Sequence, residues 1–182
     1  MFKLPQLQFA TDALEPYMSA KTLEMHYNVI HRRYVDNLNA LIKGTFLEGV
    51  SDLDTIMQLD RKMLKRDPRL LAIWHNACQH AWHSLFWESL EARDPNQEYE
   101  LPSDDQFDFK WFTAEVTEHF GDGWVAWTQF GTVVTIHETA RPPEGTLIVC
   151  DIWEHAYLLD HGPERLDYVN AFYKIVDWSL LT

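Results

Sequence analysis

A short apolar run ends in a carboxylate, and a histidine follows four residues later. The run Leu147-Ile148-Val149-Cys150 is rich in β-branched residues, as a buried strand would be, and it leads to Asp151 and then His155. A strand that stops at Asp151 and turns into a helix brings the carboxylate and the imidazole to one point. Mixed oxygen and nitrogen donors suit a transition metal better than calcium, which prefers oxygen alone. Taken by itself, the pair favours a plainer interpretation, a helix-capping aspartate with a surface histidine.

Further histidines lie on two predicted helices. His26 shares a helical face with Ile30 and Tyr34, and His83 shares one with Gln79, four residues before it. A single histidine on an apolar face is usually a satisfied core residue, whereas glutamine beside histidine on an aromatic face is unusual for a core. Together the candidate ligands are three imidazoles and one carboxylate: His26, His83, Asp151 and His155.

The elements that must position these side chains follow from periodicity and from turn residues. The pattern predicts an extended arm, then helices over 19–43, 53–65, 69–90, 103–120 and 163–181 and strands over 124–129, 132–137 and 146–150. The expected fold class is α+β. A long antiparallel helical hairpin forms an N-terminal domain over 1–93, and a mixed domain over 94–182 holds a small three-stranded antiparallel sheet and helices. The polar, proline-bounded stretch over 94–102 marks the boundary.

Composition limits the classes of function. With 182 residues, 46% of them apolar and 14% aromatic, the chain is long enough to bury a substantial core. A formal charge of −13 argues against nucleic acid and anionic membranes as partners. There is no apolar run of membrane-spanning length and no signal-peptide core near Met1, so we expect a cytoplasmic protein. Cys78 and Cys150 are expected as reduced, packed thiols, with a disulfide as the alternative.

Several motifs occur in a specific order along nearly the whole chain. They are His26-Tyr27 with His31 and Tyr34, the stretch from Asn37 to Thr45, His83-Ser84-Leu85-Phe86-Trp87, Phe120-Gly121-Asp122-Gly123-Trp124, and Asp151-Ile152-Trp153-Glu154-His155-Ala156-Tyr157. In this order they resemble the iron/manganese superoxide dismutase family. The resemblance implies dismutation of superoxide to dioxygen and hydrogen peroxide at a mononuclear iron or manganese site.

The resemblance also implies roles for individual residues. The four candidate ligands would hold one metal ion, with a solvent molecule in a fifth position. Tyr34 and Gln79 would hydrogen-bond toward that solvent, and Trp124 and Trp153 would form an aromatic wall. A local positive funnel for superoxide, offsetting the global charge, would comprise Arg165, Arg32 and Arg33.

Assembly is a further implication of the resemblance. In the family, the residue at Glu154 pairs with the ligand histidine of the other subunit across a two-fold axis, here the partner's His155. A homodimer or a higher homo-oligomer is therefore expected.

The metal is expected to be one iron ion per chain, with manganese or use of either metal as the alternative. In the family, a glutamine at the position of Gln79 goes with iron. Manganese enzymes take the equivalent amide from the sheet, around the stretch 135–139, which has no glutamine here. His137 is a complication, since some iron members place a histidine there.

The chain departs from the family pattern near the site. Ile30 and Leu158 stand where members carry a histidine and a tyrosine that hydrogen-bond across the dimer interface. Losing both together is nearly neutral for stability, but it predicts a slower peroxide-forming half-reaction because a route for protons is lost. Trp82 replaces the usual asparagine before the ligand histidine, and Ala126 stands where a second tryptophan often follows.

Two alternatives follow from these observations. The departures motivate a non-enzymatic, metal-binding relative of the same fold. A dinuclear helical oxidoreductase would instead use ligands from the helical half, namely His75, His80 and His83 with Glu24 or Glu88. The helical Glu-x-x-His pairs expected of such bundles are missing from the sequence.

Overall fold

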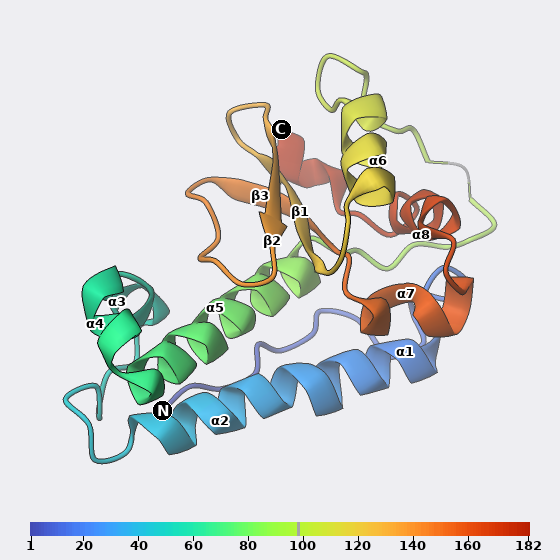
Figure 1. The fold of residues 1–182 in the computed structure, drawn as a ribbon. Helices are drawn as coiled ribbons and strands as arrows, with labels where there is room; N and C mark the ends of the chain where they lie inside the picture. Colours follow the sequence, from blue (N-terminus) through green and yellow to red (C-terminus); the bar gives the residue numbers. More distant parts are fainter. Residues whose placement is uncertain (98) are drawn as a thin grey trace.

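Two long helices lie side by side in the N-terminal half of the chain (Figure 1), in a computed structural model that describes residues 1–97 and 99–182. The first is continuous and comprises α1 (Ala20–Glu24), a π-helical segment η1 (Met25–His31) and α2 (Arg32–Ile42). The second is α5 (Pro68–Glu88). Asp67 starts α5, since its carboxylate accepts the backbone N–H groups of Arg69 and Leu70 and Pro68 follows at the first turn. The predicted hairpin is confirmed.

Two short helices connect the long ones. They are α3 (Leu53–Met57) and α4 (Arg61–Arg66), each started by an aspartate side chain that accepts a backbone N–H. The single helix expected over 53–65 is therefore wrong. Asp60 begins a new helix with its carboxylate, which divides the segment.

The sheet has the strand order β2-β1-β3 and is antiparallel throughout. Its strands are β1 (Gly123–Thr128), β2 (Val133–His137) and β3 (Thr146–Asp151), close to the predicted ranges. Gly123 allows a close approach, because a Cβ atom there would lie 2.1 Å from the carbonyl oxygen of Ile136. The register places Trp124 opposite Asp151, so the end of β3 is held against the start of β1.

The remaining helices are α6 (Phe109–Glu118), α7 (Glu154–His161), α8 (Arg165–Phe172) and a 3₁₀ turn η2 (Trp178–Leu181). The helix expected from residue 103 begins later, where the Asp108 carboxylate accepts a backbone N–H. The helix expected over 163–181 is wrong beyond Phe172. There the chain pairs with the residues that directly follow α5, through hydrogen bonds from Glu91 N–H to Ile175 O (2.7 Å) and from Asp177 N–H to Ser89 O (2.9 Å).

Helix α5 lies between α2 and the sheet (Figure 1), and both sides of it are buried. One apolar cluster, with Leu38 and Ile73, fills the hairpin, and another, with Phe86 and Val149, lies under the sheet. Cys78 belongs to the first cluster and Cys150 to the second, and both thiols are free and buried as expected. No helix within 1–97 or 99–182 is long and apolar enough to cross a membrane.

The domain division at 93/94 stays a prediction. The polar stretch expected at the boundary contains residue 98, which lies outside the described residues.

Candidate metal centre

Four side chains from four different elements converge on one buried point. His26 lies on η1, His83 on α5, Asp151 at the end of β3 and His155 in the first turn of α7, and their ligand atoms lie within 4.8 Å of one another. The Asp151 Oδ2 atom is 3.0 Å from His26 Nε2, 3.3 Å from His155 Nε2 and 3.9 Å from His83 Nε2. The strand, turn and helix expected between Asp151 and His155 thus bring both side chains to the same point.

The hydrogen bonding of these atoms fits a metal ion. The Nε2 atoms of the three histidines and Oδ2 of Asp151 are all buried, and none has a hydrogen-bond partner. A buried polar atom without a partner costs about 1–3 kcal/mol, so four at one point need an occupant. Three imidazole nitrogens and one carboxylate oxygen are a donor set suited to iron or manganese.

Neighbouring groups hold the ligand side chains in orientation. His83 Nδ1 donates to the backbone oxygen of Gln79 at 2.7 Å, which leaves the Nε2 lone pair directed at the centre. Asp151 Oδ1 accepts the backbone N–H of Trp153 at 2.9 Å, which leaves Oδ2 free. The hydroxyl of Tyr168 donates to the backbone oxygen of Asp151 at 2.8 Å and holds the end of β3.

Burial and the contacts between neighbouring side chains shift the pKa values of His26, His83 and Asp151. Burial lowers the pKa of His26, and it lowers the pKa of His83 to about 3. Burial alone would raise the pKa of Asp151, but the contacts with His155 and His26 outweigh it and hold that pKa below its ordinary value. Neutral imidazoles and an ionised carboxylate are the forms that bind a metal.

The π-helical segment explains how His26 and His31 both face inward. On a regular α-helix, residues five apart point about 140° away from each other. The wider turn, seen in the bond from Arg32 N–H to the Tyr27 carbonyl, brings both rings against His83, each with a ring-centroid distance of 5.0 Å. Such π-turns are frequent at functional sites. His31 is therefore buried, whereas Ile30, expected on the inner face, is only half-buried.

Two of the expected outer residues contact His83. The ring of Tyr34 lies 5.3 Å from the His83 ring, and burial, followed by the charge of Asp151, raises the pKa of Tyr34. Trp124 meets His83 edge-on at 5.0 Å. Trp153 lies farther out, 6.2 Å from the ring of His155. The indole N–H groups of Trp124 and Trp153 are buried without a partner, so donors are available beside the ligands.

Gln79 has a partner that sequence reasoning missed. Its amide nitrogen donates to the Thr139 hydroxyl at 3.1 Å, while its Oε1 atom is buried without a partner. The family pattern concerns only a glutamine in the stretch that includes Thr139. A hydroxyl on the loop after β2 was the available signal.

The residues expected at the substrate entrance lie in different surroundings. Arg165 donates to the Gly121 oxygen at 2.7 Å, to the Ile152 oxygen at 3.1 Å and to the Tyr157 hydroxyl at 3.1 Å. These bonds tie α8 to the loop before β1 and to the turn after Asp151. Arg32 and Arg33 are exposed on α2. Their role in steering superoxide stays a prediction.

The other expected residues do not contact the four ligand atoms. His137 is exposed at the end of β2 and stacks on His119, with ring centroids 4.3 Å apart. Glu154 is exposed at the start of α7, and Leu158 is 46% exposed one turn later.

Nothing in the described ranges supports the dinuclear alternative. Among residues 1–97 and 99–182, these four residues are the one group of three or more His, Cys, Asp or Glu side chains close enough together to hold a metal ion. His75 is exposed, and His80 is hydrogen-bonded to His31.

Comparisons with known proteins agree with this geometry. Residues 1–91 match the family model described as iron/manganese superoxide dismutases, alpha-hairpin domain, and residues 98–182 match the corresponding C-terminal domain. The proteins named Superoxide dismutase [Mn/Fe] 2 of Staphylococcus aureus strains Mu50 and N315 are 36% identical to this chain, and that of strain bovine RF122 is 37% identical. Each alignment covers 98% of this chain and 94% of the relative.

Proposed function

The chain belongs to the iron/manganese superoxide dismutase family and catalyses dismutation of superoxide to dioxygen and hydrogen peroxide; on that premise, we propose that it works with a single iron ion per chain. The proposed ligands are His26, His83, Asp151 and His155. One observation carries the proposal: three Nε2 atoms and one carboxylate oxygen, all buried and without hydrogen bonds, face one another.

A metal ion held by His26, His83, Asp151 and His155 would supply the one-electron oxidation and reduction that dismutation requires, so it must be redox-active. The protein supplies a closed site. His26, His83 and Asp151 are fully buried, and only His155, with 17% of its side chain exposed, reaches toward the surface. Tyr34 is protonated at neutral pH, and burial, followed by the charge of Asp151, raises its pKa further; we propose that it donates a hydrogen bond toward the reacting oxygen.

The choice of iron rests on Gln79. Gln79 lies on α5, one helical turn before His83, and its amide nitrogen donates a hydrogen bond to the Thr139 hydroxyl. The relatives from Staphylococcus aureus carry both metals in their names. Manganese or use of either metal is therefore the alternative.

We also propose a homodimer that forms at the face around α7. A shallow hollow there is lined by Met25, Glu154, His155, Leu158 and Leu159. Two of these side chains, Leu158 at 46% and Leu159 at 48%, are large, apolar and exposed. Glu154 is free to reach the partner's His155. The slower peroxide-forming half-reaction, expected from Ile30 and Leu158, stays a prediction.

Replacing a single ligand tests the metal site. His83→Ala and Asp151→Ala should each lower bound iron from one equivalent to well below half, and dismutase activity should fall in parallel. Each leaves three protein ligands and an additional open position. Iron measured by atomic spectrometry on folded protein, with activity on the same sample, gives the result.

The control is His75→Ala, an exposed histidine on the same helix. It should keep both metal and activity. A His83→Ala protein with full iron and full activity would overturn the ligand assignment. Reconstitution of the metal-free protein with iron and, separately, with manganese tests which metal the enzyme uses. A protein that is active with manganese and inactive with iron would contradict the proposal of iron.

A further inference from the structure

Three aromatic rings next to His83 are buried and hydrogen-bonded to one another in series. The indole N–H of Trp87 donates to His31 Nδ1 at 3.1 Å, and His31 Nε2 lies 2.7 Å from His80 Nδ1. We call Trp87, His31 and His80 the ring line. All three side chains are buried, with 3%, 0% and 5% of their surface exposed, respectively.

The direction of each hydrogen bond follows from the chemistry of the indole. An indole nitrogen is a donor only, so His31 Nδ1 must accept and carries no proton. The proton of His31 is therefore on Nε2, and it is donated to His80 Nδ1. His80 then carries its own proton on Nε2. A single tautomer is assigned to each imidazole without ambiguity.

Two members of the ring line contact the proposed metal ligands. His31 stacks on His83, with ring centroids 5.0 Å apart and ring planes 24° apart. Trp87 packs against His26, with ring centroids 4.8 Å apart. The His83 ring thus packs against two rings, edge-on with Trp124 and stacked with His31, and both contacts limit its tilt.

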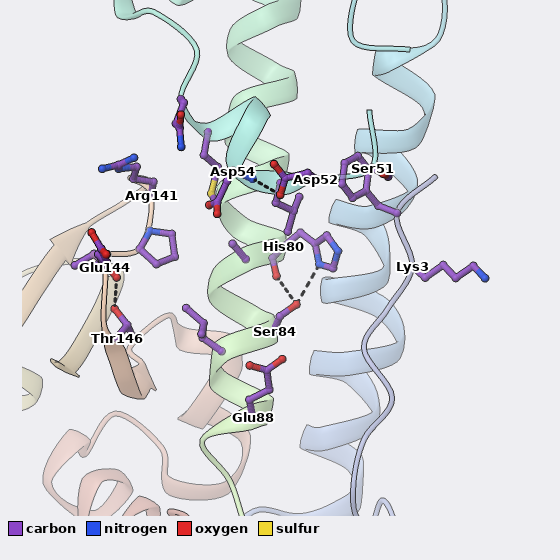
Figure 2. Close-up of a pocket in the computed structure, with 18 of the residues that line it drawn as sticks. Lys3, Ser51, Asp52, Asp54, His80, Ser84, Glu88, Arg141, Glu144 and Thr146 are labelled. Atoms are coloured by element: carbon purple, nitrogen blue, oxygen red, sulfur yellow. Dashed lines mark hydrogen bonds between the residues drawn. The ribbon is translucent and has the colours of Figure 1, made fainter. Parts of the chain in front are cut away.

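The far end of the ring line is anchored on α5 at the wall of a surface pocket. Figure 2 shows His80 beside Ser84 on this helix, with Glu88 one further turn along. The hydroxyl of Ser84 donates to the backbone oxygen of His80 at 2.9 Å and is 3.4 Å from its Nδ1 atom. His31 Nε2 is much closer to His80 Nδ1, at 2.7 Å, so His31 rather than Ser84 is the main partner of this atom.

We propose that His80 is a positioning residue for the metal centre: by accepting the hydrogen bond from His31 Nε2–H, it holds the His31 ring stacked on His83 and thereby fixes the plane of that ligand. His80 touches none of the four ligand side chains by hydrogen bond and acts through His31. The proposal rests on the metal-site assignment above, but its first test needs no metal.

Two kinds of substitution separate the acceptor from the bulk of the side chain. The Oδ1 atom of His80→Asn lies near the place of Nδ1 and keeps the acceptor. His80→Leu removes it. His80→Gln is a second disrupting variant, because its amide matches Nε2 rather than Nδ1 and remains polar toward the pocket. His75→Gln, at an exposed position on the same helix, is the matched control.

Nitrogen-15 NMR of the metal-free proteins reads the tautomers. Wild type and His80→Asn should show His31 protonated at Nε2 alone, with that proton in a hydrogen bond. In His80→Leu and His80→Gln the hydrogen-bonded Nε2–H signal should disappear, and the His83 ring signals should shift. In iron-loaded protein, release of the metal to a chelator should be about tenfold faster in both disrupting variants, and within about twofold of wild type in His80→Asn.

A role in stability alone gives a different result. The disrupting variants would then melt at a lower temperature, while the His83 ring signals and the metal release rate stayed as in wild type, and the proposal would be wrong. Equal effects of His80→Asn and His80→Leu would also overturn it. If the wild-type protein bound no metal, the ligand assignment would fail, whereas the tautomer measurement would still decide the role of His80 toward His31.

Discussion

At the scale of single residues, His83 shows how one hydrogen bond can direct a candidate metal ligand. Its Nδ1 proton is committed to a backbone oxygen one turn earlier on the same helix, at 2.7 Å. The other nitrogen is then the only one available to a metal. The partner is Gln79, so its backbone orients this candidate ligand while its side-chain amide donates to Thr139.

Two departures from the family pattern, Trp82 and Ala126, are also explained by individual side chains. Trp82 stacks on Trp124, with ring centroids 5.4 Å apart and planes 8° apart, and its indole N–H donates to the Ala140 oxygen at 2.7 Å. Ala126 lies on the same face of β1 as Trp124, since side chains alternate along a strand. Trp82 thus packs on a tryptophan whose strand face also carries Ala126, and we expect the large side chain at 82 and the small one at 126 to offset each other in volume.

This pairing predicts coupled effects on stability. Trp82→Asn should destabilise the metal-free protein by about 3–5 kcal/mol, as for other large losses from a core. Ala126→Trp alone should overpack the core at a cost of about 1–3 kcal/mol. The double variant should lose less unfolding free energy than the sum of the losses in the two single variants, by about 0.5–3 kcal/mol. Urea unfolding of the four proteins gives the coupling energy. Strict additivity would mean that the two departures are unrelated.

At the scale of elements, the facing sides of η1 and α5 bury four imidazoles against each other. They are His26, His31, His80 and His83. Burial lowers the pKa of each below its ordinary value of 6.5, to about 4 for His80 and about 3 for His83. The helices therefore pack through neutral rings.

This arrangement predicts that the metal-free protein loses stability in mild acid. Below pH 6.5 the unfolded chain takes up protons that the folded chain does not, so the stability present above pH 6.5 falls as the pH falls toward the folded pKa values. Each such histidine contributes about 1.4 kcal/mol per pH unit well below pH 6.5. Urea unfolding between pH 7 and pH 5 measures the slope.

The variant His80→Leu provides the control for this slope. In this variant, the slope of the unfolding free energy against pH should be shallower by about the contribution of one histidine, because the side chain that titrates in the unfolded state is gone. Wild-type stability that did not change between pH 7 and pH 5 would contradict the neutral packing of these helices.

At the scale of the whole molecule, the apolar face around α7 predicts assembly. Leu158→Arg should convert the proposed dimer into a monomer at micromolar concentration, because a desolvated charge would oppose contact between two copies of this face. Sedimentation equilibrium measures the mass. The matched control is Leu166→Arg, a leucine on α8 that is 52% exposed and lies outside the hollow. A wild-type monomer with full activity would rule the dimer out.

The sequence by itself determined the features that depend on local spacing. Period and turn residues predicted both long helices, all three strands and the strand, turn and helix from Thr146 to His161. The same local spacing predicted that Asp151 and His155 converge, as they do in the folded chain. These features follow from residues near one another in sequence, so the pattern is enough to place them.

Contacts between distant residues were decided only by the tertiary structure. Thr139 lies beside Gln79, sixty positions earlier, and His80 meets His31 across two helices. The π-turn that brings His31 inward is invisible to a count based on the regular α-helical period. Likewise, α8 stops at Phe172, and residues beyond it pair with the segment that directly follows α5. In each case the deciding partner is far away in sequence, and only packing brings the two together.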